Sequence, residues 1–410
     1  MAYQFTLDDV RFLSSAAGAE ALELAAALPL TDASLLGDLT RLRRLLGSST
    51  GTGRAAVVAE TVRLRRRAMG KLGPAAWQLL FTDEALQQAT PLPVASHRAG
   101  RLAGVGVHDL TCSIGADLVA LVSGSSGVVV GSDLDPVRVL MARYNLTASG
   151  LPARVAVADA LTRTSRGLLG YADPARRDGT GRRITSVSTL PSVADLDAAY
   201  ADRPPVLRLP PGIDYDALDR PGEVEIVSLD GGAREAVLWP SELARVARRA
   251  TVLLSPGSSS GLVSWEVTSD DPDDCGPVSG DLVGDFLVDP DAAVVRAHLV
   301  RHYAARHGLS MLDPHLAYLT GPAVPPGVRG FRVLDAAPYR EKTVAGWARR
   351  DRIGTLEIKQ RGTPLIPDDL RRRLRPALIG PTTVAATLVV ARIGNDAQAF
   401  WCRAVDPGQA

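Results

Sequence analysis

The stretch Val107-His108-Asp109-Leu110-Thr111-Cys112-Ser113-Ile114-Gly115-Ala116-Asp117 decides the fold. A short apolar run leads into small residues, and an apolar segment with helical spacing follows at once. This pattern is typical of a buried strand that turns tightly into a helix. At such a junction, small residues let the backbone approach a ligand and the helix N-terminus offers unpaired N–H groups. We therefore expect a ligand site here.

The same alternation of short apolar runs and helical stretches continues along the chain. Strands that alternate with helices form a parallel sheet buried on both faces, which is the α/β fold class. The pattern predicts strands at residues 105–110, 128–133, 153–157, 168–173, 206–209, 224–229 and 252–254, with an additional strand at 235–239.

Acidic residues follow four successive predicted strands. Asp109 ends the first, Asp133 the second, Asp159 the third and Asp173 the fourth, where Pro174 follows directly. The carboxyl ends of parallel strands meet at one edge of a sheet, so these carboxylates should lie close together. A carboxylate at the second strand end can accept both hydroxyls of a ribose. This order favours a nucleoside-type ligand, although acids at strand ends also cap helices.

The regions on either side of this sheet have a different character. Residues 6–100 show helical spacing and a local excess of arginine, and a Gly/Ser/Thr run at 47–53 separates two helical stretches. Residues 256–289 have the composition of a loop, and a helix is expected at 291–307. The end of the chain predicts a small basic α+β domain. We thus expect a helical domain at 1–100, the α/β domain at 101–325 and the α+β domain at 326–410.

The composition excludes several classes of protein. The net charge is +1, so a nucleic-acid surface would need local clustering of charge. The three cysteines lie far apart and match no metal-ligand spacing, so we expect neither a disulfide framework nor a metal. No apolar run approaches the roughly 20 residues of a membrane span, and no signal-peptide pattern is visible. We predict a cytoplasmic protein.

The motifs carry a resemblance to a known family. The run at 109–117 resembles the class I S-adenosylmethionine-dependent methyltransferase loop D-L-x-C-G-x-G-x-D, with Thr111 and Ser113 where glycines are common. More narrowly, the chain resembles the bacterial THUMP-like-domain methyltransferase family, which is distantly similar to RNA-cap guanine-N2 methyltransferases. That resemblance covers nearly the whole chain and includes the runs Asp173-Pro-Ala-Arg-Arg177, Ser228-Leu-Asp-Gly-Gly232, Glu235-Ala-Val-Leu-Trp239 and Leu356-Glu-Ile-Lys-Gln-Arg-Gly362.

The resemblance implies a Rossmann-like class I methyltransferase sheet with a C-terminal THUMP-like domain, and S-adenosyl-L-methionine as cofactor. The first loop would contact the methionine part, Asp133 the ribose hydroxyls and Asp159 the adenine amino group. The implied cofactor-binding residues are Asp109, Thr111, Cys112, Ser113, Gly115, Asp117, Asp133, Leu134 and Asp159.

The resemblance also implies an acceptor site. Asp173 and Pro174 match the start of the (D/N)-P-P-(Y/F/W) motif of amino-methylating members, in which the acid orients an amine. Arg176 and Arg177 replace the aromatic residue of that motif and would bind a phosphate or carboxylate of the substrate. In the C-terminal segment, Lys359 and Arg361 are expected to bind substrate as well.

The expected function is methylation of RNA, at a base amine of tRNA or rRNA, with RNA bound by the basic N- and C-terminal domains. Two alternatives remain open: a small-molecule methyltransferase, and a non-catalytic RNA-binding protein with a relict cofactor fold. A dinucleotide-dependent oxidoreductase is disfavoured, because Gly104 and Gly106 precede the first strand, whereas its glycine turn must follow the strand.

Overall fold

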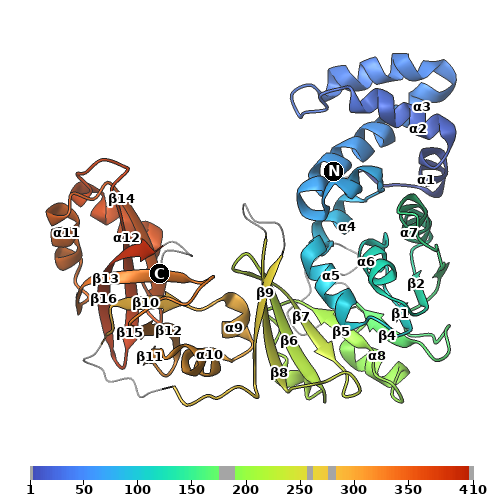
Figure 1. Ribbon diagram of the computed structural model, residues 1–410. Coiled ribbons are helices and arrows are strands. Elements are labelled where there is room, and N and C mark those ends of the chain that lie inside the picture. Colours follow the sequence, from blue (N-terminus) through green and yellow to red (C-terminus); the bar gives the residue numbers. More distant parts are fainter. Residues whose placement is uncertain (1–2, 175–189, 256–261, 276–282, 406–410) are drawn as a thin grey trace. The chain divides into compact units, whose positions relative to one another are not determined.

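The structure is a computed structural model of the 410-residue chain, shown in Figure 1. It describes residues 3–174, 190–255, 262–275 and 283–405. The chain forms two compact units. Unit 1 contains Met1–Gly222 and Arg234–Ala244, and unit 2 contains Glu223–Ala233 and Arg245–Ala410. The expected division into three domains at residues 100 and 325 stays a prediction.

Unit 1 begins with helices, as expected for residues 6–100. Gly47 interrupts α3 with a left-handed φ of 74°, so the Gly/Ser/Thr run separates two helical stretches as predicted. The first helix is capped at Thr6, whose hydroxyl accepts the Asp9 N–H while the Asp9 carboxylate accepts the Thr6 N–H. The elements are α1 (Leu7–Leu13), α2 (Ala16–Ala26), α3 (Leu35–Leu72), η1 (Pro74–Gln78), α4 (Asp83–Gln88) and α5 (Leu92–Arg101).

The sheet of unit 1 is mostly parallel and has the strand order β3-β2-β1-β4-β5-β7, in which β7 runs antiparallel to β5. Its order reverses between β1 and β4, and ligands bind at such a reversal in open α/β sheets. The strands are β1 (Val107–Asp109), β2 (Val129–Asp133), β3 (Val155–Val157), β4 (Leu169–Ala172), β5 (Val206–Leu209) and β7 (Gly232–Trp239). The α/β fold class is confirmed.

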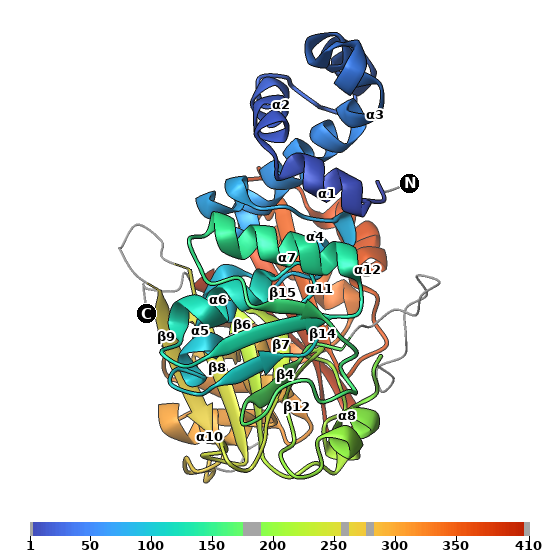
Figure 2. The same ribbon diagram turned by 90° about the vertical axis from the view of Figure 1, so that its right-hand side faces the viewer.

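Helices connect and cover these strands. The connecting elements are α6 (Ala116–Gly124), α7 (Pro136–Ala148), α8 (Val193–Ala199) and η2 (Asp216–Leu218). Figure 2 shows α6 and α7 beside the strands of this sheet. Both helices pack against β2, where Leu118, Val139 and Leu146 are buried with Val129 in one apolar cluster. The helices thus fix the strand ends at which the predicted acids lie.

Unit 2 contains two groups of strands. In the first, β6 (Glu223–Leu229) is parallel to β8 (Arg248–Leu254), which is antiparallel to β9 (Val263–Thr268). The second is a seven-stranded sheet of order β11-β12-β10-β13-β16-β15-β14. Its strands are β10 (Phe286–Asp289), β11 (Ser310–Asp313), β12 (Leu316–Gly321), β13 (Arg329–Pro338), β14 (Thr355–Arg361), β15 (Ala385–Ile393) and β16 (Asp396–Val405). Its helices are α9 (Ala292–Arg296), α10 (Val300–His307), α11 (Glu341–Arg350), α12 (Pro367–Leu374) and η3 (Arg375–Ala377).

Three expectations for the middle of the chain were wrong in detail. The polar segment 256–289 is not only a loop, because it contains β9 and β10. The helix expected at 291–307 is two helices, and His298 between them has a left-handed φ of 58°. The strands β11 and β12 had no counterpart in the prediction. Among the described residues, no helix is both long and apolar enough to cross a membrane.

Candidate functional site

A cavity of about 380 Å³ lies in unit 1 at the carboxyl ends of the parallel strands, within the size range of small-molecule sites. The predicted residues that line it are Asp109, Thr111, Cys112, Ser113, Asp117, Asp133, Leu134, Asp159 and Asp173. Gly115 and Pro174 adjoin this wall without lining it. Arg176 and Arg177 lie outside the described residues.

The loop after β1 is a tight turn with two left-handed residues. Gly115 has a φ of 79° and forms the N-cap of α6, and a side chain there would press on Ala142 of α7, whose Cβ lies 3.1 Å from the position of an added Cβ. Ser113 has a φ of 49°, a conformation that glycine adopts without strain and serine does not. The family's preference for glycine at both positions therefore has a backbone cause.

Asp133 ties this loop to the end of β2. One carboxylate oxygen accepts the Ser113 N–H and the other accepts the Asp135 N–H, each at 2.9 Å. An ionised carboxylate has about four acceptor positions, so capacity for two hydroxyl groups remains. Leu134 follows at the cavity wall and is 71% exposed. Asp159 accepts the Leu161 N–H at 2.9 Å.

Asp109 and Asp117 have opposite electrostatic surroundings. Burial, followed by the nearby Asp117 charge, raises the pKa of Asp109 well above its usual range. Burial acts in the same direction on Asp117, but the guanidinium groups of Arg98 and Arg208 overcome it and lower the pKa of that carboxyl. Burial also raises the pKa of Cys112 well above its usual range, which argues against a nucleophilic thiolate.

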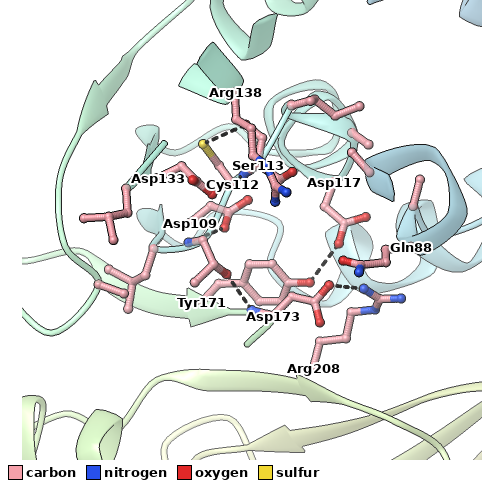
Figure 3. Close-up of a pocket in the computed structure, with 18 of the residues that line it drawn as sticks. Gln88, Asp109, Cys112, Ser113, Asp117, Asp133, Arg138, Tyr171, Asp173 and Arg208 are labelled. Carbon is pink, nitrogen blue, oxygen red and sulfur yellow. Dashed lines mark hydrogen bonds and ion pairs between the residues drawn. The ribbon is translucent and has the colours of Figure 1, made fainter. Parts of the chain in front are cut away.

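Asp173 is held from two sides, as Figure 3 shows. Its backbone N–H donates to the Thr111 hydroxyl at 2.7 Å, so the residue that stands in a glycine position of the loop fixes the end of β4. Its carboxylate forms an ion pair with Arg208 of β5. Tyr171, two residues earlier, donates its hydroxyl to Asp117 at 2.9 Å.

The charged residues that surround Asp173 were not predicted from the sequence. Arg208 also binds Glu235 of β7, and Glu235 binds Arg98 of α5. The side chains of Arg98 and Glu235 are each 1% exposed. A signal was present, because Arg208 and Glu235 are charged residues within or beside apolar strand runs. Their partners lie far away in sequence, so spacing alone could not pair them.

The two predicted substrate residues of the C-terminal segment lie in unit 2 and share one acid. Lys359 Nζ lies 2.6 Å from Asp289 Oδ2, and an Arg361 nitrogen lies 2.8 Å from Asp289 Oδ1. Each cation also lies over an aromatic ring, Lys359 over Phe331 and Arg361 over Tyr318. Much of their charge is therefore used within the protein. Their role in substrate binding remains a prediction.

The donor set of the cavity fits a nucleoside cofactor. A carboxylate at the end of β2, small residues in the loop after β1 and an exposed leucine beside them provide hydroxyl acceptors, close backbone approach and an apolar surface. Among the described residues, no group of three or more His, Cys, Asp or Glu side chains is arranged to hold a metal ion. Fold and site together define an α/β enzyme of the class that binds a nucleoside-type cofactor at its strand ends.

Comparisons with known proteins identify the family. The chain is 45% identical over 360 residues to an S-adenosylmethionine-dependent methyltransferase of Mycobacterium tuberculosis, found in two strains. This alignment covers 85% of the chain and 97% of the relative. The chain therefore belongs to the S-adenosylmethionine-dependent methyltransferases. A "THUMP domain-like" family matches residues 328–404. A crystal structure from Porphyromonas gingivalis W83, described as a methyltransferase, superposes with a TM-score of 0.71 at 21% identity, covering 98% of this chain and 100% of that one.

These findings confirm several expectations. The protein is an S-adenosylmethionine-dependent methyltransferase with an α/β methyltransferase fold, and a THUMP-like domain lies at its C-terminus. S-adenosyl-L-methionine is the cofactor that the relatives imply. The roles of individual site residues and the nature of the methyl acceptor stay predictions.

Proposed function

We propose that the protein methylates RNA, at an exocyclic amine of a base in tRNA or rRNA. The observation that carries the proposal is the THUMP domain-like match at residues 328–404 beside a methyltransferase fold. THUMP domains are associated with RNA, so this match favours an RNA acceptor by analogy. The surface of unit 2 supplies a second argument, from charge.

The cofactor is assigned to the wall of the cavity. In this proposal Asp133 accepts the ribose hydroxyls, Asp159 accepts the adenine amino group, and the loop at 109–117 surrounds the methionine part. S-adenosylmethionine, when bound, supplies a methyl group on a positively charged sulfur that is a good leaving group. The protein's task is then to align the acceptor and exclude water, since little covalent help is needed.

The acceptor side is assigned to Asp173, with Pro174 restricting the adjacent backbone. The Asp173 carboxylate accepts a hydrogen bond from the acceptor amine and directs the nitrogen lone pair toward the methyl group. The carbon–nitrogen bond forms as the carbon–sulfur bond breaks, and the methylated nitrogen releases one proton to water. Arg176 and Arg177 are proposed substrate contacts because of their place in the motif that begins at Asp173.

In this proposal, an exposed pair of arginines in unit 2 binds RNA phosphates. Arg332 of β13 lies directly opposite Arg403 of β16, so the two side chains share one face of the sheet. Both are exposed, and neither side chain makes a hydrogen bond or ion pair with a described residue, although Arg403 has a longer-range attraction to Asp351. Like charges in this position repel, and a phosphate between them would relieve the repulsion.

The test is methyl transfer and RNA binding by the full chain. We expect tritiated methyl from S-adenosylmethionine to enter bulk tRNA or rRNA, and Asp133→Ala to abolish cofactor binding in a calorimetric titration. RNA affinity should fall with salt. The double variant Arg332→Gln/Arg403→Gln should reduce the slope of log affinity against log salt by about 1.4 for single-stranded contacts.

The matched control is Lys359→Gln/Arg361→Gln, which also removes two positive charges from unit 2. If this control loses more RNA affinity than the Arg332/Arg403 variant, then Lys359 and Arg361, the residues paired with Asp289, bind the phosphates instead. Salt-insensitive RNA binding with no methyl uptake by RNA would contradict the proposal and favour the small-molecule alternative. Cofactor binding without methyl uptake by any acceptor would favour a non-catalytic protein.

A further inference from the structure

A network of charged side chains connects Asp117, in the loop at 109–117, to Asp173. Arg98 joins Asp117 to Glu235, with its nitrogens 2.6 Å from an oxygen of each. Arg208 in turn joins Glu235, at 3.0 Å from Nε, to Asp173. Each arginine therefore bridges two carboxylates, and negative and positive side chains alternate along the whole network.

The two end members of the network, Asp117 and Asp173, both line the cavity, and Asp173 is the more exposed of the two. The side chains of Arg98 and Glu235 are 1% exposed and that of Arg208 is 8% exposed, whereas Asp173 is 30% exposed. Asp173 and Arg208 both line the cavity, and Figure 3 shows them side by side at its wall. The network thus presents Asp173, its most exposed carboxylate, to the space where an acceptor would bind.

The geometry leaves Arg208 little freedom. Glu235 engages Nε of the guanidinium group, which fixes the plane of the group and directs its NH1 toward Asp173. Glu235 is itself fixed, because both of its oxygens accept from Arg98 NH1 at 2.6 Å. A cation in contact with a carboxylate stabilises its ionised form and fixes its orientation.

Stability alone does not account for such a network. Buried ion pairs recover little more than the cost of removing their charges from water, and apolar residues of similar size are often as stable. A network that ends at a reactive position has a second use, because it keeps a functional group oriented before the substrate arrives.

We propose that Arg208 is a positioning residue for methyl transfer, which holds Asp173 ionised and directed into the cavity, and that Glu235 fixes Arg208 for this purpose. This inference rests on the proposed role of Asp173 toward the acceptor amine. Arg208 acts on the acceptor through Asp173, so its loss should lower kcat for the acceptor more than it raises KM.

The first measurement reports on Asp173 without any RNA. In the full chain labelled with carboxyl-¹³C aspartate, the Asp173 resonance is identified by its loss in Asp173→Asn. We expect Arg208→Met to raise the titration midpoint of Asp173 by about one to three pH units, and Arg208→Lys to restore most of the difference. Arg138→Met, which removes another arginine from the cavity wall, should leave the midpoint in place. An unchanged midpoint in Arg208→Met would overturn the inference.

The second measurement is methyl transfer to bulk tRNA and rRNA across pH 6 to 9. Arg208→Met should lose about 100-fold in kcat near neutral pH, and the acidic limb of its profile should move to higher pH. Calorimetric binding of S-adenosylmethionine should persist, which shows that the variant is folded, and Arg208→Lys serves if it is not. A shifted Asp173 titration with an unchanged rate profile would overturn the role in transfer. If wild-type protein transfers no methyl group to RNA while the Asp173 titration is still shifted in Arg208→Met, only the RNA proposal is contradicted.

Discussion

Two pairs of arginines, one in each unit, have opposite surroundings. Arg98 and Arg208 are buried in unit 1, and each bridges two carboxylates. Arg332 and Arg403 are exposed in unit 2 and face one another across two strands. The first pair uses its charge within a buried network, whereas no described side chain forms a hydrogen bond or ion pair with the second pair. The arginine content of a segment does not distinguish these two uses.

Several arginines of the N-terminal helices resemble the buried pair, because they also bind groups within the protein. Arg65 and Arg66 donate to backbone carbonyls of neighbouring segments, such as those of Leu79 and Leu28. Arg67 pairs with Asp83. These arginines hold the helical region together, so its local basic character is a weaker argument for RNA binding than the sequence suggested. Exposed arginines remain at 41, 43 and 44.

The largest effect should come from breaking the buried network. Arg98→Met leaves Glu235 and Asp117 without a shared cation in a buried environment, and we expect it to lower the free energy of unfolding by about 3–5 kcal/mol. Urea denaturation measures this. The matched control is Arg371→Met, whose exposed ion pair with Asp368 should contribute less than about 1 kcal/mol. Equal losses of unfolding free energy in the two variants would contradict the expected difference in stabilisation between the buried and the exposed arginine.

An intermediate effect is expected at Thr111, which links the loop after β1 to Asp173. Thr111→Val keeps the shape of the side chain but removes the acceptor of the Asp173 N–H, so stability should fall by about 1 kcal/mol. Thr111→Ser retains the hydroxyl and should behave like wild type. Thermal unfolding of the three proteins provides the measurement, and a neutral Thr111→Val would show that the bond contributes nothing to the site's rigidity.

The smallest effect should have the opposite sign. Arg332→Glu places an acid opposite Arg403, and an opposite-charge pair across two strands should raise stability by about 0.2–1 kcal/mol. Arg332→Gln removes only the repulsion and should gain less. Both variants should bind RNA more weakly. A destabilised Arg332→Glu would mean that Arg332 already has a favourable environment in the folded protein.

Local patterns predicted the sheet of unit 1 well. Residues 206–209 form β5 as expected, and Asp109 and Asp133 end their strands as predicted. Strands such as β4 and β5 are buried along their length and rich in apolar residues, which makes them visible in one sequence. The predicted acids of the four strand ends all line one cavity, although their chemical roles remain predictions.

The rest depended on contacts that a single sequence does not reveal. The strand β9 reads Val-Ser-Trp-Glu-Val-Thr and alternates polar with apolar residues, but the surrounding Asp, Pro and Gly favoured a loop. The pairing of Arg98 with Glu235 joins residues 137 positions apart. Nothing local in either segment specifies the partner, because only the fold brings α5 and β7 together.

The bonds that hold Asp133 in place are all made within the chain, and this affects the timing of cofactor binding. Ordering of the turn after β1 is completed when the protein folds, so binding does not have to supply that entropy. At the proposed cofactor site, association is then expected to be a single docking event. Its rate should follow diffusion and solvent viscosity rather than the rearrangement of a loop.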